Sequence, residues 1–205
     1  MKVVKSAGTP PARTFYARDA VAVARELIGA HIVRVFDGEQ IVVRIVECEA
    51  YRDTGDAASH AYRGRTERNA PMFDAPGHAY VYFIYGMHWL FNIVAHPPGE
   101  AGAILIRAAE PLLGIERMRE LRGSRFGREA VELTNGPAKL AQALAITGDL
   151  NTADLCAAGE MYIAPGALDA AERVVNGPRV RVPGDESAKA LPWRFWIHGN
   201  AFVSR

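Results

Sequence analysis

The strongest constraint on the fold is a hairpin signal near the start of the chain. Residues 31–36, HIVRVF, and residues 40–51, QIVVRIVECEAY, are rich in β-branched side chains, and Asp37-Gly38 stands between them. An Asp-Gly pair between two such runs favours a tight turn, because both residues tolerate positive φ. A long antiparallel strand pair is therefore expected. A helix should precede it at residues 19–29, capped by Asp19 and ended by Gly29.

The rest of the chain predicts an α+β fold with a mostly antiparallel sheet. Residues 79–96 are typical of two aromatic strands that reverse at Tyr85-Gly86, and residues 52–78 form a long polar loop of the kind that often carries function. Further strands are expected at 103–111, 161–165, 179–183 and 193–199, and helices at 112–122 and 139–146. We therefore expect a flexible tail at 1–13. A single domain should follow at 14–205, with a curved sheet, flanking helices and a protruding β-hairpin.

Composition narrows the class of protein. The 205 residues carry 24 Lys+Arg and 23 Asp+Glu, a net charge of +1, so any affinity for nucleic acid must come from local clusters. With only two cysteines, no apolar run of membrane length and no signal-peptide core, the sequence favours the cytoplasm. Zinc-ligand spacing, a P-loop, a nucleotide-binding glycine fingerprint and a serine elbow are all missing from the sequence. No metal or organic cofactor is expected.

Two carboxylates stand at the end of the long second strand. Because side chains alternate across a strand, Glu47, Glu49 and Tyr51 follow aliphatic residues on one face. Buried carboxylates are costly unless they are paired or used in chemistry. The pattern alone leaves a second alternative equally open, in which the strand runs out into solvent and both carboxylates are hydrated.

The turn at Tyr85-Gly86 is unusual because turn positions are mostly occupied by Asn, Asp or Gly. An aromatic ring there is either folded back onto the sheet or offered outward to a partner. Proteins that distort duplex DNA insert apolar side chains between base steps in the outward arrangement. The pattern by itself favours the ring folded back.

Arginines beside glycines in loops suit phosphate contacts, because guanidinium groups and backbone amides can bind the same anion. Arg63, Arg65 and Arg68 lie in the loop at 60–69, and Arg125 lies in a basic loop at 123–128. Lys139 follows a Gly-Pro pair at the start of a predicted helix and could also reach a phosphate. A solvated charged surface is the alternative, and it is favoured for the helical run of charges at 116–122.

Taken together, five blocks in order resemble the alkyladenine (3-methyladenine) DNA glycosylase family. They are VECEAY, ASHAYRGRTERNAPMF, GHAYVYFIYGMHWLFNIV, AILIRAAEP and LTNGPAKLAQALAI, and the similarity extends over nearly the whole chain. The chain is similar to the minimal, bacterial-type members, which have no long N-terminal extension. It departs at Leu90, where relatives often carry Cys, and at His88, where some carry Tyr, and both changes could alter the width of the pocket.

The resemblance implies a role for particular residues. Glu49 matches the general base that activates water, and Arg107 a residue that positions this water, with Glu47 in support. Tyr51 and Tyr82 match the rings on either side of the flipped base, and Tyr85 the ring that fills the gap in the duplex. His60 matches a residue that hydrogen-bonds the base edge, and Asn92 one that screens bases at the pocket.

The implied activity is a monofunctional DNA glycosylase in base excision repair. It would hydrolyse the N-glycosidic bond of alkylated purines, of the 3-methyladenine and 7-methylguanine type, and of some deaminated purines. The expected partner is damaged double-stranded DNA, bound by a monomer in the cytoplasm and associated with the nucleoid. Two rival hypotheses are a carbohydrate-acting glycosidase that uses Glu47 and Glu49 as an acid/base pair, and a nucleic-acid binder without activity.

Overall fold

Strands β1 (His31–Phe36) and β2 (Glu39–Arg52) form the expected hairpin in the computed structural model, which describes residues 8–123 and 129–204. Asp37 and Gly38 take φ values of 50° and 78°, as a tight turn between two strands requires. The β2 strand is the longest of the sheet and is 14 residues long, so different parts of it have different neighbours. Its first part pairs with β1, and residues 47–49 pair with β8.

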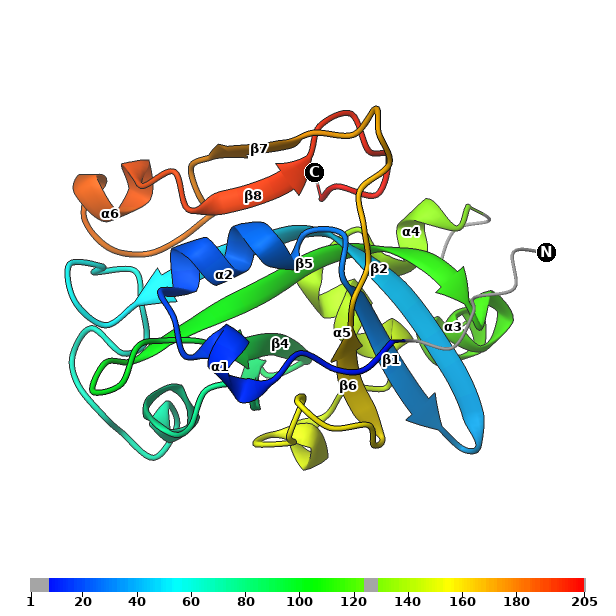
Figure 1. Cartoon of the computed structure of the whole chain (residues 1–205), viewed down its shortest axis with the longest axis horizontal. Helices are drawn as coiled ribbons and strands as arrows, with labels where there is room; N and C mark the ends of the chain where they lie inside the picture. Colours follow the sequence, from blue (N-terminus) through cyan, green and yellow to red (C-terminus); the bar gives the residue numbers. More distant parts are fainter. Residues whose placement is uncertain (1–7, 124–128, 205) are drawn as a thin grey trace.

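The described residues form one curled sheet in which all named pairings are antiparallel (Figure 1). Its order is β3-β4-β5-β2-β1-β6, and β8 joins β2 to β7. The strands not yet given bounds are β3 (Ala79–Ile84), β4 (His88–Val94), β5 (Gly102–Leu113), β6 (Met161–Ala164), β7 (Val174–Gly177) and β8 (Arg194–Ile197). The middle of β2 therefore lies between β5 and β8.

Short helices cover this sheet. Helix α2 (Ala20–Leu27) packs on β2 and β5, and its first turn is capped by Asp19, whose Oδ1 accepts from Val21 N at 3.1 Å. Helix α5 (Pro137–Ala143) packs on β4 and β5. The other helices are α1 (Arg13–Tyr16), α3 (Ile115–Arg122), α4 (Val131–Thr134) and α6 (Glu186–Ala190), with 3-10 turns η1 (Ala70–Phe73) and η2 (Gly148–Leu150).

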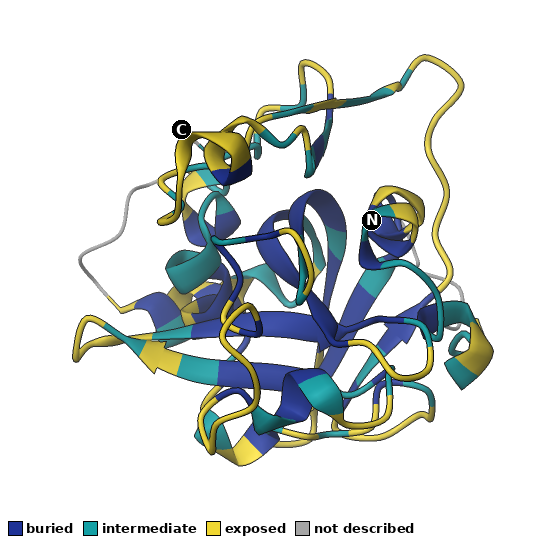
Figure 2. Ribbon diagram, turned by 90° about the vertical axis from the view of Figure 1, so that its left-hand side faces the viewer, coloured by how far each residue is buried: buried dark blue, intermediate teal, exposed yellow. Residues whose placement is uncertain are grey.

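The hydrophobic core joins both groups of helices to the central strands. Val23 and Leu27 of α2, Ile45 of β2 and Leu140 of α5 belong to one buried cluster. Figure 2 shows the middle strands buried along most of their length, with exposed residues at the hairpin tips and connecting loops. Each such aliphatic side chain contributes about 1.5–3 kcal/mol on burial. The central part of β2 is thus held rigidly.

The predicted α+β fold, with its curved antiparallel sheet and protruding hairpin, is confirmed. Two local predictions were wrong. Strand β5 continues to Leu113, so α3 begins only at Ile115, after Gly114 with φ of 78°. Residues 179–183 form no strand. Arg179 buries its guanidinium group against the Asp56 carboxylate, and Arg181 has a φ of 53°, which a strand does not allow. The strand in this region is β7, at Val174–Gly177.

The boundaries of the tail and the domain stay predictions. Of the expected flexible tail at 1–13, residues 1–7 lie outside the described residues, and α1 begins at Arg13. None of the helices in the described ranges is long and apolar enough to cross a membrane.

Candidate active site

Glu47 and Glu49 are buried, with 0% of either residue exposed, so the solvated alternative is wrong. Arg107 on the neighbouring strand β5 lies between them: its Nε is 3.0 Å from Glu47 Oε1 and its Nη1 is 3.3 Å from Glu49 Oε1. The β2–β5 register is irregular on both sides of Glu47, and such β-bulges re-aim side chains. Burial opposes the charge on Arg107, but Glu49 and Glu47 outweigh it and raise the pKa of Arg107.

Glu47 is held by three donors and is not part of the cavity lining described below. Oε1 accepts from Arg107 Nε at 3.0 Å and from Arg194 Nε at 2.6 Å, and Oε2 accepts from the backbone N–H of Ser204 at 2.7 Å. Ser204 Oγ in turn accepts from Arg107 Nη2 at 3.2 Å. Strand β8 and the segment after it therefore hold Glu47 and Arg107 in place. Arg194 and Ser204 were not predicted, because nothing local in the sequence links them to Glu47, which lies 147 and 157 positions earlier.

Glu49 is held differently. Its Oε1 accepts from the backbone N–H of Val180 at 2.7 Å, beside the ion pair with Arg107, and its Oε2 accepts from the Tyr51 hydroxyl at 2.8 Å. Burial, followed by the charge of Glu49, raises the pKa of Tyr51 well above its usual value, so Tyr51 stays protonated and donates. A carboxylate offers about four acceptor positions. The described residues leave one position on Oε2 for a further donor such as water.

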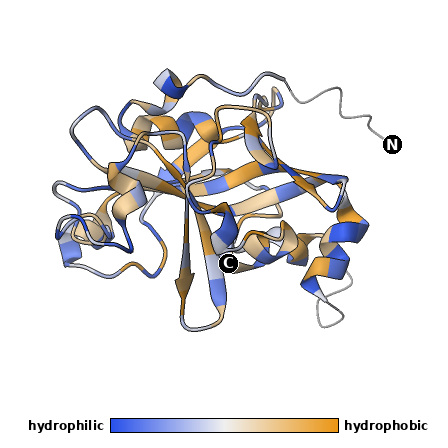
Figure 3. Cartoon of the chain, turned by 90° about the horizontal axis from the view of Figure 1, so that it is seen from below, coloured by the Kyte–Doolittle hydropathy of each residue, from blue (hydrophilic) through white to orange (hydrophobic). Residues whose placement is uncertain are grey.

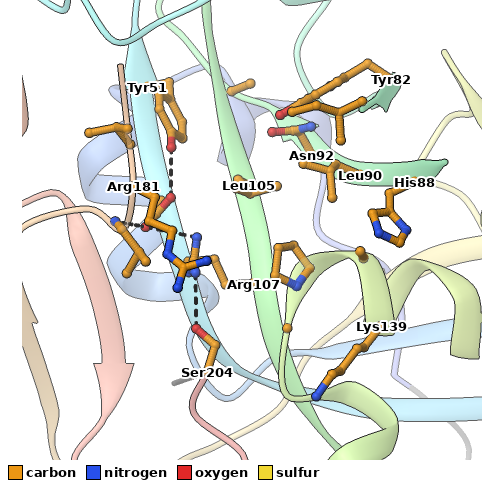
Figure 4. Close-up of a pocket in the computed structure, with 18 of the residues that line it drawn as sticks. Tyr51, Tyr82, His88, Leu90, Asn92, Leu105, Arg107, Lys139, Arg181 and Ser204 are labelled. Carbon is orange, nitrogen blue, oxygen red and sulfur yellow. Dashed lines mark hydrogen bonds and ion pairs between the residues drawn. The ribbon is translucent and has the colours of Figure 1, made fainter. Parts of the chain in front are cut away.

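Glu49 lines a cavity of about 880 Å³. Figure 4 shows Tyr51 and Arg107 on one side of it and Tyr82 and Asn92 on the other, with Leu105 between them. His88 and Leu90, the two departures from the family pattern, also line the cavity. The residues expected to hold a base are therefore brought together around one space with aromatic rings on opposite sides.

His60, Tyr80 and Tyr82 form one wall. His60 Nδ1 is 3.0 Å from the Tyr80 hydroxyl, and the His60 ring meets the Tyr82 ring edge-on with centroids 4.8 Å apart. Asn92 is buried and donates to the Tyr80 carbonyl at 3.0 Å. Burial, with a smaller contribution from Arg68, lowers the pKa of His60, so this ring is neutral near pH 7. Burial also raises the pKa of Tyr82 to about 12.

The β3–β4 hairpin carries Tyr85 at its tip. The Tyr85 residue is 81% exposed with φ of 54°, Gly86 has φ of 67°, and Met87 N donates to the Ile84 carbonyl at 3.2 Å across the turn. Figure 3 shows the hairpin extending beyond the rest of the fold at the bottom of the view. The alternative in which the ring folds back onto the sheet is wrong. Met87, which the sequence analysis did not single out, is also 68% exposed there.

The basic residues expected at the DNA backbone lie in different settings. Arg63 is exposed, whereas Arg65 pairs with Asp74 at 2.8 Å. Arg68 donates to the Phe83 carbonyl at 3.2 Å and lies over the ring of Tyr82, which lines the cavity. Lys139 lines the cavity and donates to Asn135 Oδ1 at 2.8 Å. Arg125 lies outside the described residues.

The described lining of the cavity is cationic. Four lining side chains carry a positive charge, against the single carboxylate of Glu49: these are Arg107, Arg122, Lys139 and Arg181. Within residues 8–123 and 129–204, no group of three or more His, Cys, Asp or Glu side chains is arranged to hold a metal ion. The net positive charge of the lining suits an anionic ligand.

Comparison with known proteins agrees with this site. Residues 14–201 match the family described as Methylpurine-DNA glycosylase. Relatives named "Putative 3-methyladenine DNA glycosylase" include one from Carboxydothermus hydrogenoformans, 47% identical over 94% of this chain and 97% of the relative. Those from Methanocella arvoryzae and Streptomyces avermitilis are each 44% identical, over 94% and 96% of this chain and 94% and 91% of the relatives.

These findings define the protein as an enzyme of the DNA glycosylase class. Within that class, the chain belongs to the methylpurine-DNA glycosylase family.

Proposed function

We propose that this enzyme removes alkylated purines, of the 3-methyladenine and 7-methylguanine type, from double-stranded DNA. It hydrolyses the N-glycosidic bond of a nucleotide rotated out of the helix and leaves an abasic site. The observation that carries the proposal is the Glu49 carboxylate, which has one acceptor position open and lines the same cavity as the rings of Tyr51 and Tyr82. We expect a monomer that acts in the cytoplasm on nucleoid DNA.

The reacting bond is inaccessible inside a stacked duplex, so the nucleotide must first be extruded at a cost of a few kcal/mol. Tyr85 at the exposed hairpin tip would fill the gap and offset part of the lost stacking. Stacking on an aromatic side chain contributes about 1–3 kcal/mol per base, so Tyr51 and Tyr82 together can hold the extrahelical base. His60 and Asn92 then face the base edge from the same wall.

Glu49 is suited to activate water at the sugar. As the bond between C1′ and the purine nitrogen breaks, its electron pair leaves with the base and the sugar gains oxocarbenium character. Water supplies the new C1′–O bond, and Glu49 accepts its proton. The Tyr51 hydroxyl, the Val180 N–H and Arg107 keep the carboxylate oriented. No covalent enzyme intermediate and no strand cleavage follow from this arrangement.

The charge of the lesion matters for both binding and departure. A 3- or 7-alkylated purine is cationic, which strengthens its attraction to the faces of Tyr51 and Tyr82 and makes it a good leaving group. A deaminated purine such as hypoxanthine is neutral and must be protonated as it departs. We therefore expect slower excision of deaminated purines than of alkylated ones.

The contacts of Glu47 argue against a carbohydrate-acting glycosidase. Such an enzyme needs two carboxyl groups that both reach the substrate. Glu47 is bound by Arg107, Arg194 and Ser204 and is not among the residues that line the cavity, so it does not reach a substrate there. We assign Glu47 the role of anchoring Arg107.

Single-turnover excision of an alkylated purine from a duplex oligonucleotide tests the proposal. Glu49→Gln should abolish release of free base while binding of lesion DNA is retained. Glu39→Gln is the matched control, because Glu39 is an exposed residue at the other end of the same strand. If the wild-type protein binds the lesion duplex without releasing base, the protein is a non-catalytic binder and the mechanism is wrong.

A further inference from the structure

The segment at 179–184 is anchored on both sides of one exposed arginine. The Arg179 side chain is fully buried and forms two hydrogen bonds with the Asp56 carboxylate, at 2.7 and 2.6 Å. It also donates to the carbonyls of Ala50 and Ala188, each at 3.0 Å. On the other side, Gly184 lies so close to the backbone of Ala57 and Ala58 that a Cβ there would be 3.0 Å from Ala57 C. The backbone between these anchors has little freedom.

Arg181 lies in this segment in a strained conformation. Its φ of 53° is in the left-handed region, which a non-glycine residue rarely occupies without compensation. The neighbouring Val180 directs its N–H to Glu49 at 2.7 Å, so the turn that strains Arg181 is also the turn that holds the catalytic carboxylate. Residue 181 is exposed and lines the cavity, and among the described residues no hydrogen bond or ion pair engages its guanidinium group.

The position of Arg181 relative to Glu49 indicates which part of a nucleotide it can reach. Glu49 must lie beside C1′ of the sugar, because water attacks there. The phosphodiester groups on either side of that sugar remain at the mouth of the cavity, where they connect to the duplex. Figure 4 shows Arg181 on the same side of the cavity as Tyr51 and Arg107, with Lys139 further along the lining. A long cationic side chain at this place meets the backbone of the extruded nucleotide before it meets the base.

We propose that Arg181 binds a phosphodiester group flanking the extruded nucleotide, a role that rests on the proposed function. The guanidinium fork is suited to two phosphate oxygens at once, and it is always charged. Arg107, the other arginine beside Glu49, is committed to Glu47 and Glu49 and has no such freedom. Arg181 would thus bind the sugar–phosphate backbone to the same turn that positions Glu49 through the Val180 N–H. This contact would hold the sugar next to the Glu49 carboxylate.

Binding measured at several salt concentrations tests this role. The probe is a duplex with a tetrahydrofuran abasic-site analogue, and the variants are Arg181→Ala, Arg181→Lys and Arg25→Ala. Arg25 is an exposed arginine of α2 outside the cavity lining, so Arg25→Ala is matched in net charge. Arg181→Ala should weaken binding about tenfold at low salt and reduce the slope of log K against log[salt] by about 0.9, the value for one phosphate contact. Arg181→Lys and Arg25→Ala should keep nearly the wild-type slope.

Arg181→Gly separates binding from folding. Glycine adopts positive φ without strain, so this variant should keep or raise the melting temperature while it loses the same phosphate contact as Arg181→Ala. If Arg181→Ala and Arg181→Gly keep the wild-type salt slope and affinity while the wild type excises base, the phosphate contact is wrong and the proposed function stands. If the wild type neither excises base nor prefers the analogue to undamaged duplex, the proposed function itself fails.

Discussion

The hairpin tip and the carboxylates beside Arg107 are opposite kinds of site. Tyr85 is an aromatic residue in solvent, whereas Glu47 and Glu49 are charged residues in the interior, so each reverses the usual distribution. The tip is held by its own two strands and one turn hydrogen bond. The carboxylates are held by Arg107, Arg194, Tyr51 and two backbone N–H groups from distant segments.

The two regions should therefore respond differently to substitution, in DNA binding at the tip and in folding stability at the carboxylates. An exposed side chain can change DNA binding with little effect on folding, because it has few intramolecular contacts to lose. A buried ionic group links chemistry to stability, because removing one partner leaves an uncompensated charge. Variants at the two sites should therefore differ in whether they lose folding stability or only activity on DNA.

Arg107→Met should give the largest loss. It leaves the buried carboxylates of Glu47 and Glu49 near each other without the cation between them, which costs about 3–5 kcal/mol of unfolding free energy. Urea unfolding measures this loss, and single-turnover excision should fall with it even under conditions where the variant is folded. A variant with wild-type stability would show that Arg194 and the backbone donors alone compensate both carboxylates.

Tyr85→Ala should affect function alone. Its removal should change the unfolding free energy by less than about 0.5 kcal/mol, the usual range for an exposed residue. Excision from a fully paired duplex should fall about tenfold, because stacking worth about 1–3 kcal/mol per base is lost at the gap. The control is the same lesion opposite a missing base, where the gap needs no filling and the variant should be less impaired. Equal losses of excision on both substrates would contradict the proposal that Tyr85 fills the gap in the duplex.

Ser204→Ala should have a small and graded effect. It removes the hydroxyl that accepts from Arg107 Nη2 and keeps the backbone N–H that binds Glu47. The loss of one hydrogen bond predicts about 0.5–1.5 kcal/mol in unfolding free energy. Excision should slow moderately, with binding of lesion DNA unchanged. An excision rate as low as that of Arg107→Met would mean that the hydroxyl contacts the substrate directly.

The smallest effect is expected at His60, in the pH dependence of the unfolding free energy. Burial lowers the pKa of His60 below the 6.5 of an unfolded chain, so its contribution to stability is complete above pH 6.5. That contribution is lost as the pH falls from 6.5 through the lower folded pKa, where the unfolded chain binds a proton first. Unfolding free energies at pH 7 and pH 5 should therefore differ less in His60→Gln than in the wild type. An unchanged difference would assign the pH dependence to other groups, such as His31, whose pKa burial also lowers.

Local chemistry made much of the fold predictable. The Asp37-Gly38 turn, the Asp19 cap and the strands on either side of Tyr85-Gly86 depend on residues close in sequence. Prediction failed at residues 179–183, where an alternating Arg-Val pattern is typical of a strand. The contact of Arg179 with Asp56, 123 residues away, outweighs that pattern, and no local signal announces it.

The sequence by itself determined the α+β class, the hairpins and the family, because turn chemistry, periodicity and ordered motifs are written along the chain. Only the tertiary structure decided that Glu47 is an anchor, that Glu49 keeps one open acceptor position, and that Arg181 reaches the cavity. These properties depend on the donors that distant segments bring to one carboxylate. The partners of a carboxylate such as Glu47 cannot be read from the sequence, because they are brought to it by the pairing of β8 with β2.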